Sequence, residues 1–164
     1  MEIRTKIEVL ILLGANMGAV KKTFTHALDE LGKIGQILKV SSLYSSPSWG
    51  FQASDFQNQA AIIETELSPQ ELLNSILSIE KHLGRVRVGT GYQSRIIDID
   101  IILIKNKVVN TTALTVPHPK MHERKFVLVP CSEIAAEWNH PLLNKKVDEM
   151  LKNCEDSSKI TMIE

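Results

Sequence analysis

The sequence predicts an α+β fold, in which helices pack on an antiparallel sheet and a C-terminal hairpin and helical tail follow. Two strand-helix-strand units follow one another, and the connection between the middle strands is non-helical. The 164 residues, 43% hydrophobic and 23% charged, are enough for one domain with a substantial core. We therefore expect one domain over residues 1–164, with helices on one face of the sheet. The segment from about 152 onward should be its least constrained part.

The first unit begins with an apolar run at residues 9–13, which is too short to span a membrane and predicts a buried strand. Glu2 and Glu8 disagree with the basic start of a signal peptide, so we expect a cytoplasmic protein. Apolar residues then recur at helical spacing over residues 20–31, and Gly32 is placed to end that helix.

A predicted strand at residues 37–44 completes the first unit, and the second unit begins with a predicted strand at residues 56–67, followed by a helix. That helix should begin at the capping box of Ser68 and Glu71 and end at Gly84. Its apolar face comprises Leu72, Leu73, Ile76, Leu77, Ile79 and Leu83. Glu80 falls within this face, so it either pairs with an arginine or belongs to a site at the helix end.

The next predicted strand, at residues 95–104, carries two carboxylates. Asp98 and Asp100 should point the same way, because side chains alternate along a strand. The opposite face should be apolar and is formed by Ile97, Ile99, Ile101 and Leu103. Two like charges among apolar neighbours call for a positive partner, and oxygen ligands suit Mg²⁺. The alternative is an edge strand whose acids face water.

Arginines bracket this acid pair, although the chain as a whole has no net charge. They are Arg85, Arg87, Arg95 and Arg124. Guanidinium groups bind phosphate oxygens in a bidentate manner, so acids and arginines together indicate phosphoryl transfer. The alternative is that the arginines only neutralise the acids. Residues 14–18 lack the Lys-Ser/Thr ending of a Walker A loop. The balanced charge of the chain does not predict binding to nucleic acid or to a membrane.

Histidines and cysteines give weaker signals. His118 and His122 have the spacing of zinc ligands, but Pro119 and the lack of a third ligand nearby disfavour zinc. His118 is better interpreted as a hydrogen-bond donor to phosphate. The remaining residues are predicted to be structural or exposed: surface histidines at His26, His82 and His140, and free thiols at Cys131 and Cys154.

These segments together resemble the 6-hydroxymethyl-7,8-dihydropterin pyrophosphokinase family of folate biosynthesis over about residues 8–150. The resemblance is carried by LGANMG at 13–18, SSLY at 41–44 with Pro47, DFQN at 55–58, EKHLGRVR at 80–87, RIIDIDIIL at 95–103 and VPHPKMHERKFVLVP at 116–130. It implies a ferredoxin-like fold and transfer of pyrophosphate from ATP to the pterin hydroxymethyl group, with release of AMP. It also implies two Mg²⁺ ions, ATP as co-substrate, a monomer, and no nucleic-acid or membrane partner.

The resemblance also assigns residues by motif. Asp98 and Asp100 would hold the metal ions, with Arg85 and Arg95 as further catalytic residues. The ATP-binding residues would be Arg85, Arg87, Arg95, Thr115, His118 and Arg124. The pterin-binding residues would be Ser46, Pro47, Trp49, Phe56, Asn58 and Phe126. Glu80 and Tyr92 would support the site, although Tyr92 stands where the family has tryptophan and Phe56 where tyrosine is common.

Two other functions fit the same residues. One is a non-catalytic ferredoxin-like module with a nucleotide or metal site. The other is a metal-dependent nucleotidyl transferase that uses the same two acids. Product analysis separates them, since only a pterin-dependent conversion of ATP to AMP supports the pyrophosphokinase.

Overall fold

The computed structural model describes residues 4–47, 55–84 and 96–163. A strand-helix-strand pattern opens the chain and is repeated once. The elements are β1 (Ile7–Ala15), α1 (Val20–Leu31), β2 (Gln36–Val40), β3 (Tyr44–Ser46), β4 (Phe56–Thr65), α2 (Pro69–His82), β5 (Asp98–Ile104), β6 (Val109–Asn110), β7 (Thr115–Val116), the 3-10 helix η1 (Met121–Glu123), α3 (Lys125–Ala135), β8 (Asn139–His140), β9 (Lys145–Lys146), α4 (Val147–Lys152) and β10 (Thr161–Met162).

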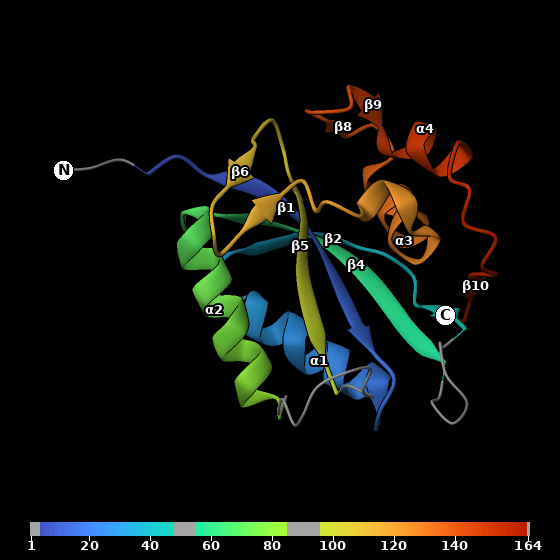
Figure 1. Ribbon diagram of the computed structural model, residues 1–164. Helices are drawn as coiled ribbons and strands as arrows, with labels where there is room; N and C mark the ends of the chain where they lie inside the picture. Colours follow the sequence, from blue (N-terminus) through green and yellow to red (C-terminus); the bar gives the residue numbers. More distant parts are fainter. Residues whose placement is uncertain (1–3, 48–54, 85–95, 164) are drawn as a thin grey trace.

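One antiparallel sheet organises the fold (Figure 1). Its strand order is β10-β3-β4-β1-β5, and β2 pairs with the other end of β4. The long strands β1 and β4 lie at the centre, because their apolar residues are buried on both faces. β5 pairs with β1 and lies at one edge. This arrangement confirms the predicted α+β class and the strand-helix-strand pattern.

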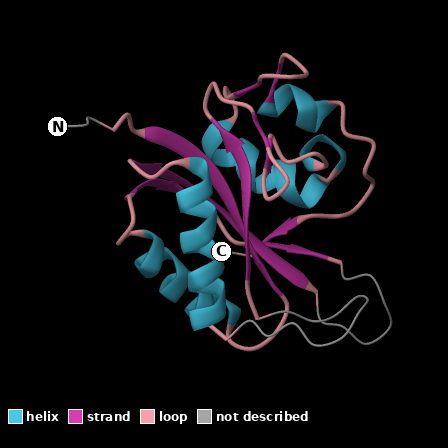
Figure 2. Cartoon of the chain, turned by 60° about the vertical axis from the view of Figure 1, so that its left-hand side comes forward, coloured by secondary structure: helices cyan, strands magenta, loops and turns pink. Residues whose placement is uncertain are grey.

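Helices cover both faces of this sheet (Figure 2). α1 and α2 pack on one face around an apolar cluster that includes Phe24, Leu31, Leu72 and Ile76. α3 and α4 pack on the other face, where Leu128, Cys131 and Met150 belong to a second cluster. The expectation of helices on a single face is therefore wrong. The apolar stripe of α3 needs a surface to cover it, and only the second face of the sheet provides one.

The strand that carries the acids is irregular. Leu10 pairs with Leu103, but Ile11 pairs with Ile101, so Ile102 is an extra residue on β5. The bulge changes the face on which later residues lie. Leu103 belongs to the α3 side of the core and Ile104 to the α1 and α2 side. The prediction that Leu103 shares a face with Ile99 is therefore wrong, because strict alternation does not continue through a bulge.

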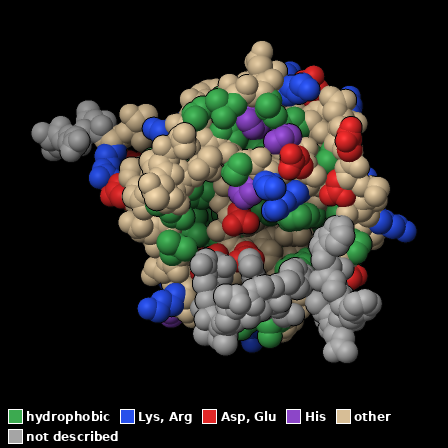
Figure 3. All heavy atoms as spheres, viewed as in Figure 1, with side chains coloured by type: hydrophobic (Ala, Val, Ile, Leu, Met, Phe, Trp, Pro, Cys, Tyr) green, Lys and Arg blue, Asp and Glu red, His purple; other side chains and the backbone are tan. Residues whose placement is uncertain are grey.

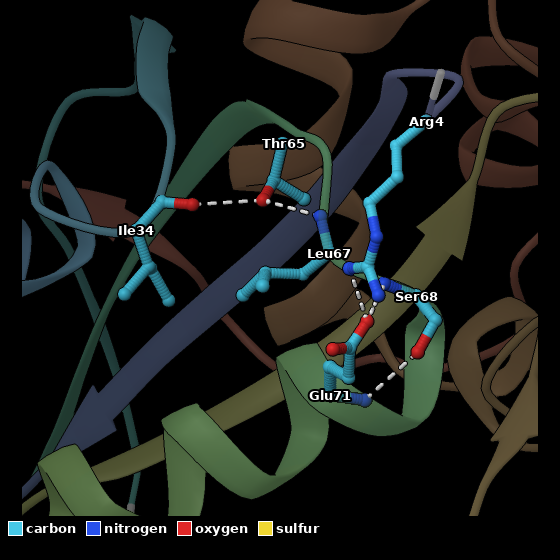
Figure 4. Close-up of polar contacts among 6 residues, drawn as sticks. All are labelled: Arg4, Ile34, Thr65, Leu67, Ser68 and Glu71. Atoms are coloured by element: carbon cyan, nitrogen blue, oxygen red, sulfur yellow. Dashed lines mark hydrogen bonds and ion pairs between the residues drawn. The ribbon is translucent and has the colours of Figure 1, made fainter. Parts of the chain in front are cut away.

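The start of α2 confirms the capping box (Figure 4). The Glu71 backbone N–H donates to Ser68 Oγ over 3.2 Å, and Glu71 Oε1 accepts from the Ser68 backbone N–H at 3.0 Å. Arg4 Nη1 also donates to Glu71 Oε1 at 2.6 Å. Just before the helix, Thr65 Oγ1 donates to the Ile34 carbonyl and accepts from the Leu67 backbone N–H. The beginning of α2 is thus fixed to both the sheet and the N-terminal segment.

No helix among the described residues is long and apolar enough to cross a membrane. The chain beyond residue 152, predicted to be the least constrained part, forms specific contacts. β10 pairs with β3, and the Asp156 carboxylate accepts a hydrogen bond from the Lys125 backbone N–H.

His140 is buried, so the predicted surface position is wrong. Its Nδ1 accepts hydrogen bonds from the backbone N–H groups of Leu142 and Leu143, at 3.2 and 3.1 Å. Its ring meets the ring of His122 edge-on, with centroids 6.4 Å apart. A lone pair on Nδ1 is needed for both hydrogen bonds, so the folded chain favours neutral His140.

We therefore predict that His140 makes stability depend on pH. Burial, and then the nearby His122, lower the pKa of His140 below its ordinary 6.5. As the pH falls below about 6.5, His140 of the unfolded chain binds a proton before His140 of the folded chain does, so the free energy of unfolding falls. His140→Asn keeps an acceptor but cannot titrate. Chemical denaturation at about pH 7 and about pH 5 measures the free energy of unfolding at each pH. This free energy should decrease less between the two pH values for the variant than for the wild type, and equal decreases would contradict the prediction.

Candidate functional site

Three polar side chains, Asn58, Asp98 and Asp100, form a row across the centre and edge of the sheet. Asn58 of β4 and Asp98 of β5 both pair with Gly14 of β1, which lies between them. Residues paired directly across strands share a face, and Asp100 lies two residues beyond Asp98 on that same face. Asn58 and the two carboxylates therefore lie together on the face that α3 covers further along.

Glu80 connects α2 to the strand between the two acids. It is only 3% exposed, and its Oε2 accepts a hydrogen bond of 2.7 Å from the backbone N–H of Ile99. Glu80 thus fixes the backbone of β5 at the residue that separates Asp98 from Asp100.

A first cavity of about 400 Å³ opens beside this row. Five of the six residues predicted to bind pterin line it: Ser46, Pro47, Phe56, Asn58 and Phe126. Asn58 is 5% exposed, and its Nδ2 donates to the Leu13 carbonyl at 3.2 Å, which fixes the carboxamide. The cavity therefore combines two aromatic side chains with one oriented amide, which suits a flat heterocycle with a hydrogen-bonding edge.

Gly14 is a further site residue that the sequence did not predict. A Cβ atom at this position would lie 2.9 Å from Asn58 Nδ2, closer than side chains tolerate. Gly14 therefore leaves the space that the Asn58 carboxamide occupies. The sequence shows a glycine near the end of an otherwise apolar strand, but only the pairing with Asn58 explains why a glycine is needed there.

A second cavity of about 320 Å³ lies along the outer edge of β5. Its lining includes Thr115, His118 and Glu80, together with the apolar residues Leu73, Leu77, Ala113 and Leu114. Leu77 belongs to the predicted apolar face of α2, but it is 47% exposed because it lines the open cavity. Asp98, Asp100 and His118 line both cavities. Figure 3 shows acidic, basic and histidine side chains gathered beside the hollow in this face.

His118 is held in a defined orientation. Its backbone N–H donates to the Ile102 carbonyl at 2.8 Å, and its Nδ1 accepts from the Lys120 backbone N–H at 3.2 Å. Burial, and then the charge of Arg124, lower the pKa of His118. The ring is therefore neutral at neutral pH with its proton on Nε2, which makes Nε2 a hydrogen-bond donor. Arg124 lies 5.8 Å from the centre of the Phe126 ring, in a cation–π contact.

The residues fit magnesium better than zinc. No group of three potential His, Cys, Asp or Glu ligands occurs within the described parts of the chain. His122 instead lies against His140, as described above. Mg²⁺ needs only one or two carboxylates when substrate phosphates supply further oxygens, and Asp98 and Asp100 provide that donor set.

Five predicted site residues lie in 48–54 and 85–95, outside the described residues: Trp49, Arg85, Arg87, Tyr92 and Arg95. Of the predicted ATP-binding residues, Thr115 and His118 line the second cavity, whereas Arg124 and His118 line the first.

Comparison with known proteins gives a consistent match. A family model described as 7,8-dihydro-6-hydroxymethylpterin-pyrophosphokinase (HPPK) matches residues 10–136. The 2-amino-4-hydroxy-6-hydroxymethyldihydropteridine pyrophosphokinase of Aquifex aeolicus is 37% identical over 142 residues, which cover 86% of this chain and 88% of the relative. The enzyme of the same name from Haemophilus influenzae is 35% identical over 159 residues, covering 95% and 98%.

Longer proteins contain a similar unit. The folic acid synthesis protein FOL1 of Dictyostelium discoideum is 35% identical, over 93% of this chain but 23% of the relative. A Plasmodium falciparum HPPK-DHPS structure has a TM-score of 0.71 at 15% identity, over 93% of this chain and 43% of that one. At this identity the structural match supports the fold, and the chain spans less than half of either longer protein.

Proposed function

Because the chain belongs to the 7,8-dihydro-6-hydroxymethylpterin-pyrophosphokinase family, its activity is pyrophosphoryl transfer from ATP to hydroxymethyldihydropterin in folate biosynthesis, and we propose that this transfer occurs between the two cavities. The pterin would occupy the first cavity, between Phe56 and Phe126 and beside Asn58. ATP would occupy the second cavity, with its phosphates directed toward Asp98 and Asp100.

One observation carries this proposal: Asp98, Asp100 and His118 line both cavities. A transfer reaction between two substrates needs the reacting groups at a common boundary, and these residues form one. A nucleotidyl transferase acting on nucleic acid would need a basic surface instead, and the chain has no net charge.

The reaction requires an in-line displacement at the β-phosphorus. The hydroxyl oxygen of the pterin forms a bond to this phosphorus, the bridge to the α-phosphate breaks, and AMP leaves with the bridging oxygen while the hydroxyl proton is released. Little covalent chemistry is demanded of the protein, so positioning and charge neutralisation should supply most of the rate enhancement.

Each described residue then has a defined task. Asn58 reads the edge of the pterin, and Phe56 and Phe126 pack on its faces. Neutral His118 donates from Nε2 to a phosphate oxygen, and Arg124 contributes a fixed positive charge. Asp98 and Asp100 would hold two Mg²⁺ ions, which when bound neutralise charge on the triphosphate. Glu80 keeps the two carboxylates in register.

The arginines 85, 87 and 95 are proposed from the sequence alone to bind the phosphates, with Arg85 and Arg95 as catalytic residues. We also propose that the protein acts as a monomer in the cytoplasm. Cys131 and Cys154 are both unpaired, which suits a reducing compartment. Light scattering coupled to size exclusion tests the oligomeric state.

Product analysis tests the function. With Mg²⁺, ATP and 6-hydroxymethyl-7,8-dihydropterin, the protein should form AMP and the pterin diphosphate in equal amounts, and no AMP when the pterin is left out. Formation of ADP, or release of free pyrophosphate, would contradict pyrophosphoryl transfer. Absence of any turnover would favour the non-catalytic module.

A further inference from the structure

The chain ends in a segment that connects two walls of the first cavity. This C-terminal strap, residues 153–163, follows α4 and lies beyond the stretch that the family model matches, which ends at residue 136. Figure 1 shows it running from α4 to β10, and β10 pairs with β3 at the edge of the sheet. It contacts the rest of the chain at two places that bear on the cavity.

The first contact is at the beginning of α3. The N-cap residue Arg124 makes no side-chain capping hydrogen bond. Instead, Oδ2 of Asp156 accepts from the backbone N–H of Lys125 at 3.0 Å, and Oδ1 accepts from the Ser158 backbone N–H at 2.9 Å. The first N–H groups of a helix lack partners within the helix, and a carboxylate there also faces the positive end of the helix dipole. Asp156 therefore caps α3 from a distance of 31 residues.

This end of α3 carries the aromatic wall of the cavity. Arg124 precedes the capped residue, and Phe126 and Val127 follow it in the first turn. All three line the first cavity. A helix end that lacks its cap frays first in its first turn, so the capping carboxylate bears directly on where Phe126 lies.

The second contact is on β3. Thr161 and Met162 of β10 pair with Ser45 and Tyr44, and the backbone N–H of Ile163 donates to the Leu43 carbonyl at 2.8 Å. β3 ends at Ser46, which lines the cavity together with Pro47. The strap thus adds a strand next to the part of β3 that forms another wall.

A direct link between these walls also exists. The hydroxyl of Tyr44 on β3 donates to Oε1 of Glu133 on α3 at 2.5 Å, and the Ser42 backbone N–H donates to the same carboxylate. These bonds lie in the second half of α3, two turns from Phe126. The strap supplies the additional restraint at the end of α3 that faces the cavity.

We propose that the C-terminal strap is a positioning element for the pterin, which holds the Phe126 wall and the Ser46–Pro47 wall in place through Asp156 and β10. The proposal rests on the proposed function, since it takes the first cavity as the pterin site. The strap bonds to residues that adjoin the lining of the first cavity: Lys125 lies between Arg124 and Phe126, and Ser45 precedes Ser46. None of these bonded residues adjoins Leu73, Leu77, Ala113 or Leu114 of the second cavity, so loss of the strap should affect pterin far more than ATP.

Matched variants of the full chain test this. Asp156→Ala should raise the KM and Kd for 6-hydroxymethyl-7,8-dihydropterin by about fivefold or more, because the cap is lost, with the KM for ATP changed by less than about twofold. Asp156→Asn should stay within about twofold of the wild type, because asparagine caps as well as aspartate. At the second contact, Ile163→Pro removes the N–H donated to Leu43, whereas Ile163→Val keeps it, so only the proline variant should weaken pterin binding.

Hydrogen exchange at residues 125–128 provides a structural readout. These amides should exchange faster in Asp156→Ala than in Asp156→Asn, with thermal midpoints recorded to show that both variants fold. Unchanged exchange, or a pterin Kd equal to that of the wild type in both Asp156→Ala and Ile163→Pro, would overturn the proposal. Equal losses for pterin and an ATP analogue would also overturn it, since they would indicate a general structural role. A wild type that binds no pterin would instead refute the proposed function.

Discussion

Replacing Asp98 or Asp100 by asparagine is expected to lower turnover by about 100-fold or more. Each change keeps the shape of the side chain but removes a negative charge and a metal ligand at the boundary of the two cavities. Phosphoryl transfer depends mainly on positioning and charge neutralisation, so the loss of one metal ligand should lower the rate directly. Steady-state kinetics at saturating Mg²⁺ measure the effect.

Asp29→Asn is the matched control, because it makes the same chemical change on the exposed face of α1. Its turnover should equal that of the wild type. Thermal melting with an ATP analogue gives a second readout. Added Mg²⁺ should raise the melting temperature of the wild type and of Asp29→Asn, but much less that of the two site variants. Wild-type turnover in both site variants would refute the assignment of the metal ligands.

Replacing Asn58 by alanine is expected to weaken pterin binding by about 1 to 3 kcal/mol, roughly five- to 150-fold, while binding of a non-hydrolysable ATP analogue stays nearly unchanged. Asn58 is buried and lines the first cavity, so its loss leaves polar atoms of a bound pterin without a partner. The ATP analogue should be insensitive because Asn58 is not among the residues that line the second cavity.

Gln57→Ala supplies the comparison for this experiment. Gln57 is the next residue on β4, and its side chain points to the opposite face of the sheet. Calorimetric titration of each variant with each ligand should therefore show a loss of affinity only for Asn58→Ala with pterin. If Asn58→Ala weakened both ligands equally, Asn58 would be a structural residue.

The order of elements and the position of the acids follow from local rules. The capping box at Ser68 and Glu71 involves neighbouring residues, so the sequence predicts the start of α2 to the residue. Asp98 and Asp100 share a face because they are two residues apart on a strand, whatever that strand packs against. The resemblance to the pterin pyrophosphokinases adds residue roles, and the family match supports the function that the resemblance implies.

Several errors arose where distant residues decide the outcome. Leu103 changes face because β5 has one residue more than its partner between two pairs. Leu77 is exposed because the second cavity opens against α2, and His140 is buried because the hairpin of β8 and β9 folds its ring against η1. Hydrophobic periodicity describes one element at a time, so it cannot show which face a neighbour leaves open.

The sequence by itself therefore determined the elements, the shared direction of Asp98 and Asp100, and the class of chemistry, because those properties depend on residue type and short spacing. Tertiary structure alone decided that Gly14 makes room for Asn58, that Glu80 fixes the backbone between the acids, and that the acids lie between two cavities. These contacts join residues at least 19 positions apart, or strands paired across the sheet. Such contacts exist only once the chain has folded, and no local pattern records them.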